Sequence, residues 1–129
     1  MIYAIIGIVL GIVLGFVVAL PIPLEFTRYT AVIIIGMLDA FFGALRAEVT
    51  KDRYNSLIFI TGFLFNILLA VGITFLGDKL GLDLYLAATF VFTFRIFSNV
   101  GIIRRGIVQK FIEKKTSIRA KHVLTDILD

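Results

Sequence analysis

The sequence is poor in the residues on which much protein chemistry depends. It contains no cysteine, no tryptophan, two prolines and one histidine, His122, among 129 residues. The lack of cysteine excludes disulfides and thiolate metal sites, and one histidine in a polar stretch excludes a histidine metal cluster or a His-based catalytic triad. No glycine-rich phosphate loop follows a strand pattern. We therefore expect a protein that is not an enzyme and that holds no metal or cofactor.

Charged residues are also scarce. They make up 17% of the chain, whereas 60% is hydrophobic and the mean hydropathy is +1.04. A soluble domain is about 45–50% apolar, so these values indicate a chain that lies mostly in a bilayer, and its length allows one domain. The net charge is +4, and the basic residues collect beside apolar segments. We expect anionic lipid headgroups, rather than nucleic acid, as the partner of these charges.

Four apolar segments are long enough to cross a hydrocarbon core of roughly 30 Å. They lie at 2–20, 30–46, 56–76 and 84–104. Pro21 and Pro23 are expected to stop the first helix, Asn55 to cap the third, Gly81 to end it and Asp83 to cap the fourth. The sequence thus predicts an all-α fold, an integral membrane four-helix bundle with a cytoplasmic amphipathic C-terminal tail.

The first segment could be mistaken for a signal peptide because it is apolar, but three features argue against that interpretation. It begins without a positively charged region, its apolar run is long for such a peptide, and no Ala-x-Ala site follows it. We interpret residues 2–20 as a retained helix.

The distribution of Lys and Arg predicts the orientation. Ten of these residues fall on the side of loop 46–55 and of the tail, and two, Arg28 and Lys79, fall on the other. Cytoplasmic loops carry an excess of such residues, so both termini are expected in the cytoplasm, with the protein in the plasma membrane. We divide the chain into a transmembrane domain, 1–105, and a basic amphipathic tail, 106–129.

Several basic residues are candidates for contact with lipid headgroups. They are Arg46, Arg104, Arg105, Lys110 and Lys114. Arg46 is either an interface anchor or a partner of Glu48. Arg104 and Arg105 are most simply anchors that stop the fourth segment. Spaced apolar residues in the tail suit a helix that lies on an anionic leaflet, or one that docks on a partner.

Three polar residues lie at the centres of separate apolar segments. Asp39, Asn66 and Arg95 are each within one residue of a segment midpoint, and Asn99 follows Arg95 on the same helix face. Charges at such depth are costly, so we expect the three to satisfy one another. Two interpretations remain open: an ion pair that sets the register of three helices, or a proton, ion or substrate contact.

Small residues recur on the same predicted faces. Gly36 and Gly43 share a stripe with Asp39, and Gly62 precedes Asn66 by one helical turn. In the first segment Gly7, Gly11 and Gly15 form a double small-xxx-small pattern, which allows close helix approach. Packing within the monomer competes there with formation of a homo-oligomer or binding to a helix of another protein.

With these residues in view, the chain resembles the small basic protein family of Gram-positive bacteria. The resemblance covers most of residues 1–105. It rests on Leu38-Asp39-Ala40 with Gly43 and Arg46-Ala47, on Gly62-Phe63 with Asn66, on Leu80-Gly81 with residues 83–88, and on Arg95, Asn99 and residues 102–105. The resemblance implies a multi-pass plasma-membrane protein whose gene lies near those for cell division and peptidoglycan synthesis. It implies no established biochemical activity.

Three functions are consistent with this sequence. The first is a non-enzymatic membrane protein that scaffolds or modulates a cell-envelope or cell-division assembly through helix–helix contacts with other membrane proteins. The second is a small transporter, or the membrane subunit of one, that uses Asp39, Asn66 and Arg95. The third is a lipid-binding protein that reads headgroups through Arg46, Arg104 and Arg105.

Overall fold

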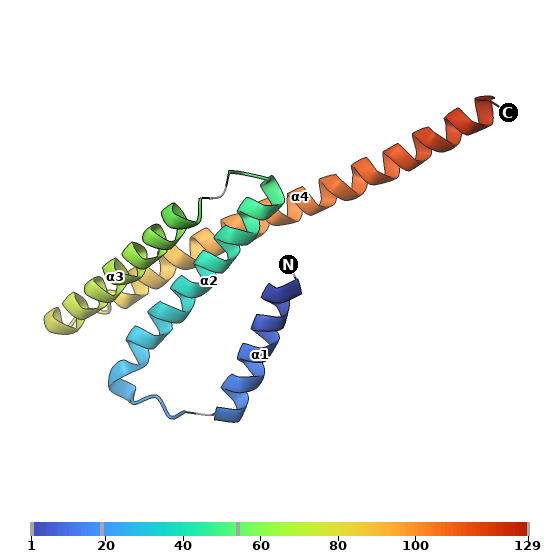
Figure 1. Ribbon diagram of the computed structural model, residues 1–129. Coiled ribbons are helices and arrows are strands. Elements are labelled where there is room, and N and C mark those ends of the chain that lie inside the picture. The colour runs from blue at the N-terminus through green and yellow to red at the C-terminus, as the bar shows by residue number, and fades with distance from the viewer. Residues whose placement is uncertain (1, 19, 54, 129) are drawn as a thin grey trace.

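The computed structural model describes residues 2–18, 20–53 and 55–128, and every regular element within them is a helix. Helix α1 spans Ile2–Val18, a short 3-10 helix (η1) spans Leu24–Phe26, α2 spans Thr27–Thr50, α3 spans Ser56–Leu80 and α4 spans Tyr85–Leu128 (Figure 1). The all-α prediction is confirmed, and each predicted segment corresponds to one helix. Three helices, α2 (with η1), α3 and α4, are long and apolar enough to cross a membrane. Helix α1 is apolar too, but has 17 residues.

The ends of α3 follow the predicted chemistry. The Asn55 side chain accepts hydrogen bonds from two backbone N–H groups of the first turn, at 3.0 and 3.3 Å, and so caps the helix. Gly81 ends α3 with a left-handed φ of 66°, a conformation that glycine adopts at no steric cost. Helix α4 begins at Tyr85, and among the described residues the Asp83 carboxylate pairs with Arg28 and accepts no hydrogen bond from the first turn, so the predicted cap is not formed.

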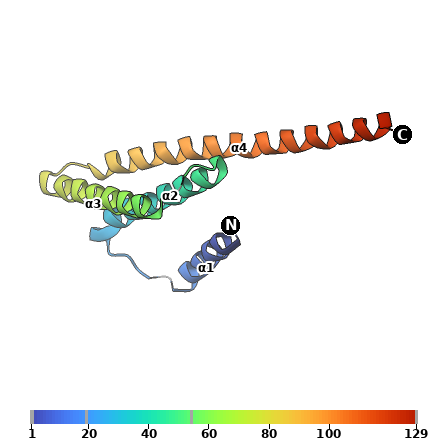
Figure 2. The same ribbon diagram turned by 45° about the horizontal axis from the view of Figure 1, so that its top comes forward.

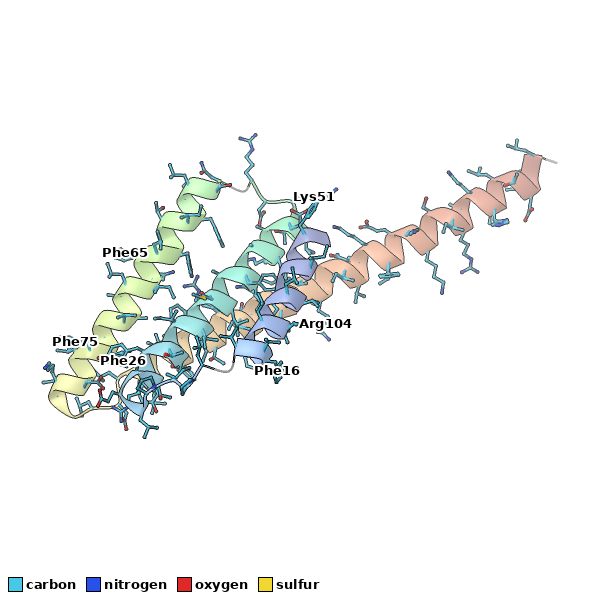
Figure 3. The ribbon with its side chains drawn as sticks, turned by 60° about the horizontal axis from the view of Figure 1, so that its bottom comes forward. Phe16, Phe26, Lys51, Phe65, Phe75 and Arg104 are labelled. Carbon is cyan, nitrogen blue, oxygen red and sulfur yellow. The ribbon has the colours of Figure 1, made fainter. Side chains whose placement is uncertain are left out.

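Helices α2, α3 and α4 form the packed unit, with α2 in contact with both others. Its contact with α4 is the most extensive, and α3 and α4 contact each other least. The small buried apolar core comprises Val32, Ala70, Ala88 and Phe92. Larger side chains such as Phe65 and Phe75 point outward (Figure 3). This pattern suits lipid, in which helices associate through small and polar residues and bulky apolar groups face acyl chains.

Helix α1 stands apart from this unit. Among the described residues it makes no contact with α2, α3 or α4, and two views show it separate from them (Figures 1 and 2). The described residues therefore comprise a packed group of three helices and one helix, α1, that the other described helices do not cover.

Helix α4 is longer than the sequence predicts. It runs for 44 residues without a break, about 66 Å at 1.5 Å per residue, and it extends straight past every other helix (Figure 2). The segment 105–128 holds no proline, and its one glycine, Gly106, lies against α2, where an added Cβ would come within 2.5 Å of Val49. Because nothing interrupts the helix there, the tail continues the axis of α4.

Candidate functional site

Asp39 and Arg95 form an ion pair between α2 and α4. The Arg95 Nη2 lies 3.3 Å from the Asp39 Oδ2. The Asp39 side chain is 4% exposed, whereas that of Arg95 is 48% exposed. The pairing expected from the sequence is thus present, but the two partners differ in environment: the acid is buried between helices, and half of the base faces open space.

The Asp39 carboxylate is only half satisfied. Its Oδ1 is buried and accepts no hydrogen bond from the described residues. Asn66, which we expected to complete the set, lines the same cavity of about 200 Å³ with Asp39 and Arg95. It forms no hydrogen bond with either of them in the described part of the chain. Three helices therefore bring the predicted residues to one cavity, but only two of these residues bond directly.

A second polar contact lies closer to the α2–α3 loop. The Arg46 Nη1 donates to the Oδ1 of Asn99 at 3.4 Å, and Asn99 is buried. No salt bridge joins Arg46 to Glu48 within the described residues. The partner of Arg46 is the side-chain amide of Asn99 on α4 instead. This contact and Arg95 line a further cavity of about 390 Å³, together with Ser98, Gly43 and Asp52.

The predicted packing glycines fall into two groups. Gly36 is buried, and an added Cβ would overlap the end of the Ile67 side chain and approach the Phe92 ring at 3.3 Å. At Gly43 it would meet Asn99 in ordinary contact, at 3.9 Å. At Gly7, Gly11, Gly15 and Gly62 it would meet nothing within 4 Å. Gly36 therefore permits close packing within the chain, whereas the neighbours of Gly43 leave room for a side-chain carbon. At the α1 glycines no such contact within the monomer occurs among the described residues, and contact of that face with another helix stays a prediction.

A polar cluster that the sequence pattern does not indicate lies at the opposite end of the packed unit, at the α3–α4 turn. Arg28 pairs with Asp78 at 3.1 Å and with Asp83 at 3.0 Å, and its guanidinium lies 5.2 Å from the centre of the Tyr85 ring. The Tyr29 hydroxyl donates to Asp78 at 2.7 Å. These residues join the start of α2 to the α3–α4 turn. The sequence feature that could have predicted this cluster is charge balance. Asp78 and Asp83 fall on the same side of the predicted topology as Arg28, where charged residues are few.

The candidate headgroup residues lie along α4 and at the end of α2. Arg104 and Arg105 are exposed and line a groove with Thr50 and Gly106, and Figure 3 shows Arg104 beyond the core of the packed unit. Lys110 and Lys114 are exposed on the extension of α4. Their contact with lipid stays a prediction. No group of three or more His, Asp or Glu side chains suited to a metal ion occurs among the described residues.

Comparison with known proteins places this arrangement in a family. A family model described as "Protein of unknown function (DUF1290)" matches residues 22–108, which contain η1, α2, α3, the first part of α4 and all three polar contacts. The "Small basic protein" of Bacillus subtilis is 40% identical over 111 residues, covering 86% of this chain and 91% of the relative. Uncharacterized proteins of Mycobacterium bovis and Mycobacterium tuberculosis are 34% identical over 86 residues, covering 65% of this chain and 70% of each relative. No solved structure matches. The chain therefore belongs to the DUF1290 family, as its resemblance to the small basic proteins indicated.

Proposed function

We propose that this protein is a non-enzymatic integral protein of the plasma membrane that scaffolds or modulates a cell-envelope or cell-division assembly. Two elements support an assembly role, because each lies outside the packed unit and has a surface that the described residues do not cover. One is α1, and the other is the part of α4 beyond residue 106. An apolar helix with free faces suits contact with a helix of another membrane protein, and the polar extension suits contact with a soluble partner.

Both termini lie in the cytoplasm in this proposal. The α2–α3 loop and the α4 extension lie toward the same end of the packed unit (Figure 1). Residues 104–128 carry seven Lys or Arg against two Asp or Glu. At the opposite end, the charge of Arg28 is balanced by Asp78 and Asp83. An excess of positive charge marks the cytoplasmic side.

The observation that carries the proposal is the uncovered glycine face of α1. Nothing lies within 4 Å of the positions that side chains would take at Gly7, Gly11 and Gly15. Small residues at this spacing let a second helix approach closely, and lipid gains nothing from them. The face therefore suits a helix that the described part of the chain does not supply.

Photo-crosslinking in native membranes tests the proposal. A photoreactive side chain at Leu14, beside the glycine face, should give a stoichiometric crosslink to another protein, with a second copy of this chain as one identifiable product. The same group at Phe16, on the opposite face of α1, is the matched control and should give mainly lipid adducts. Recovery of no stoichiometric protein adduct from Leu14 would count decisively against an assembly role for α1.

A transport function is the second candidate, and one observation favours it. Asp39, Asn66 and Arg95 line an open cavity rather than a closed, fully packed contact. Polar residues at mid-membrane depth that face a cavity are typical of ion and substrate pathways. The test is flux of protons or small cations in liposomes that hold the purified protein. Flux lost in Asp39→Asn and retained in Asp52→Asn would support transport, and absence of flux in the unaltered protein would oppose it.

A further inference from the structure

Arg95 is only partly satisfied by Asp39. A guanidinium has five N–H donors and no acceptor, and among the described residues the one ion-pair partner of Arg95 is Asp39, with Oδ2 3.3 Å from Nη2. Half of the side chain is exposed although it lies in an apolar stretch of α4. Hydrocarbon solvates such a group poorly. Helix α1 offers no carboxylate to Arg95, since Tyr3 is its only polar residue.

Arg95 also lines the cavity near the loop end of α2, together with three further residues that carry hydrogen-bond donors: Arg46, Ser98 and Asn99. Arg46 uses one nitrogen on the Asn99 Oδ1 at 3.4 Å. The amide nitrogen of Asn99 and the hydroxyl of Ser98 form no hydrogen bond with the rest of the described chain. Residues with two guanidiniums, an amide and a hydroxyl thus line about 390 Å³ of space between α2, α4 and the start of α3.

Acceptors are few around the same cavity. The one carboxylate that lines it is that of Asp52, at the loop end, and it accepts a hydrogen bond from the Thr50 hydroxyl at 2.7 Å. Arg46 has no ion pair within the described residues. Asp39 and Asp52 balance the two guanidiniums in net charge, so selectivity here rests on the excess of hydrogen-bond donors over acceptors.

We propose that this cavity binds a phosphate group. A phosphate presents several oxygen acceptors and no competing apolar surface, and guanidiniums recognise it through paired N–H donors. Phe59 and Phe94 also line the cavity, next to the polar groups. Aromatic walls beside a donor cluster at the basic end of the bundle suit the phosphate of an anionic lipid with its glycerol and acyl stem, and a soluble phosphate shares the same chemistry. The site goes beyond the assembly role and does not depend on it.

Native mass spectrometry of the purified full-length protein tests the site. The protein is exchanged into micelles that contain phosphatidylglycerol or a neutral glycolipid with the same acyl chains, and the retained lipid is counted. In a parallel arm, inorganic phosphate is added and thermal unfolding is compared with chloride of equal ionic strength. The variants are Arg46→Gln and Ser98→Ala. Arg53→Gln is the matched control, since it removes the same charge from the neighbouring loop, outside the cavity.

We expect phosphatidylglycerol to be retained in preference to the glycolipid. Loss of one charge-assisted hydrogen bond should weaken retention about tenfold in Arg46→Gln. Ser98→Ala should weaken it less, and Arg53→Gln should leave it unchanged. Stabilisation by inorganic phosphate without lipid preference would support the site and assign it to a soluble ligand. Equal retention of both lipids without any effect of phosphate, or equal loss in Arg46→Gln and Arg53→Gln, would overturn the proposal.

Discussion

The α3–α4 turn and the centre of the packed unit are held by charges in very different environments. At the α3–α4 turn, Arg28 has two carboxylate partners and a tyrosine ring, and all three ionised side chains are at least one-third exposed. At the centre, Arg95 has one carboxylate partner among the described residues, Asp39, whose side chain is 4% exposed. The turn has more bonds, yet exposed pairs are worth about 0–1 kcal/mol, whereas breaking a buried pair costs roughly 3–5 kcal/mol. Burial, rather than the number of contacts, should therefore determine which cluster contributes more to the stability of the fold.

The largest expected effect comes from separating the central pair. Asp39→Ala and Arg95→Ala each leave one charge without its partner, so each should destabilise the fold by on the order of 3–5 kcal/mol. The double variant Asp39→Ala/Arg95→Met removes both charges and should recover most of the lost stability. Unfolding midpoints in a denaturing detergent, with the yield of monodisperse protein, measure this.

The double variant also separates the two roles considered for the pair. If it folds and keeps its native partners or activity, the pair only sets the register of the helices. If it folds and loses them, the charges have a further role. A double variant no more stable than either single one would contradict the ion pair as the source of the stability.

A smaller effect is expected from the packing that holds the turn end. A Cβ added at Gly77 would lie 2.6 Å from the carbonyl oxygen of Leu82 and 2.9 Å from the Leu84 Cβ. Backbone atoms of the turn cannot move aside cheaply, so Gly77→Ala should destabilise the fold by about 1–3 kcal/mol. Gly72→Ala on the same helix is the control, since nothing lies within 4 Å of its added carbon. Equal unfolding midpoints for the two variants would show that the turn does not depend on close packing.

The difference between the two clusters also explains what the sequence could predict. Asp39 and Arg95 are conspicuous because their neighbours are apolar, so their depth and their pairing followed from hydropathy alone. Arg28, Asp78 and Asp83 lie near helix ends, where charges are ordinary, and a one-dimensional pattern does not reveal that three such residues meet.

The contacts of the remaining polar residues depend on rotations that hydropathy does not determine. Asn66 reaches the cavity without bonding to the pair, and Arg46 turns toward Asn99 rather than Glu48. The separation of α1 was equally hidden, because small residues at this spacing have the same appearance whether their partner lies inside or outside the chain. The continuous α4 was misjudged because a change in polarity at residue 105 resembles a helix end, although no residue there stops the helix.

The smallest effect is expected at the exposed cluster, and its dependence on salt should distinguish it from the buried pair. Arg28→Gln removes two exposed ion pairs and the contact with the Tyr85 ring, so it should destabilise the fold by about 1 kcal/mol or less at low ionic strength. Since salt screens exposed charges over roughly 3 Å at 1 M, the difference from the unaltered protein should nearly vanish there. The cost of Asp39→Ala should persist, because the carboxylate that it removes from the ion pair with Arg95 is buried. Lys79→Gln, which removes a nearby cation that has no ion pair in the described chain, is the control. Unfolding midpoints at 0.05 and 1 M NaCl measure how far salt changes the destabilisation by each variant. Equal salt sensitivity of Arg28→Gln and Asp39→Ala would mean that burial does not determine the relative stability of the two clusters.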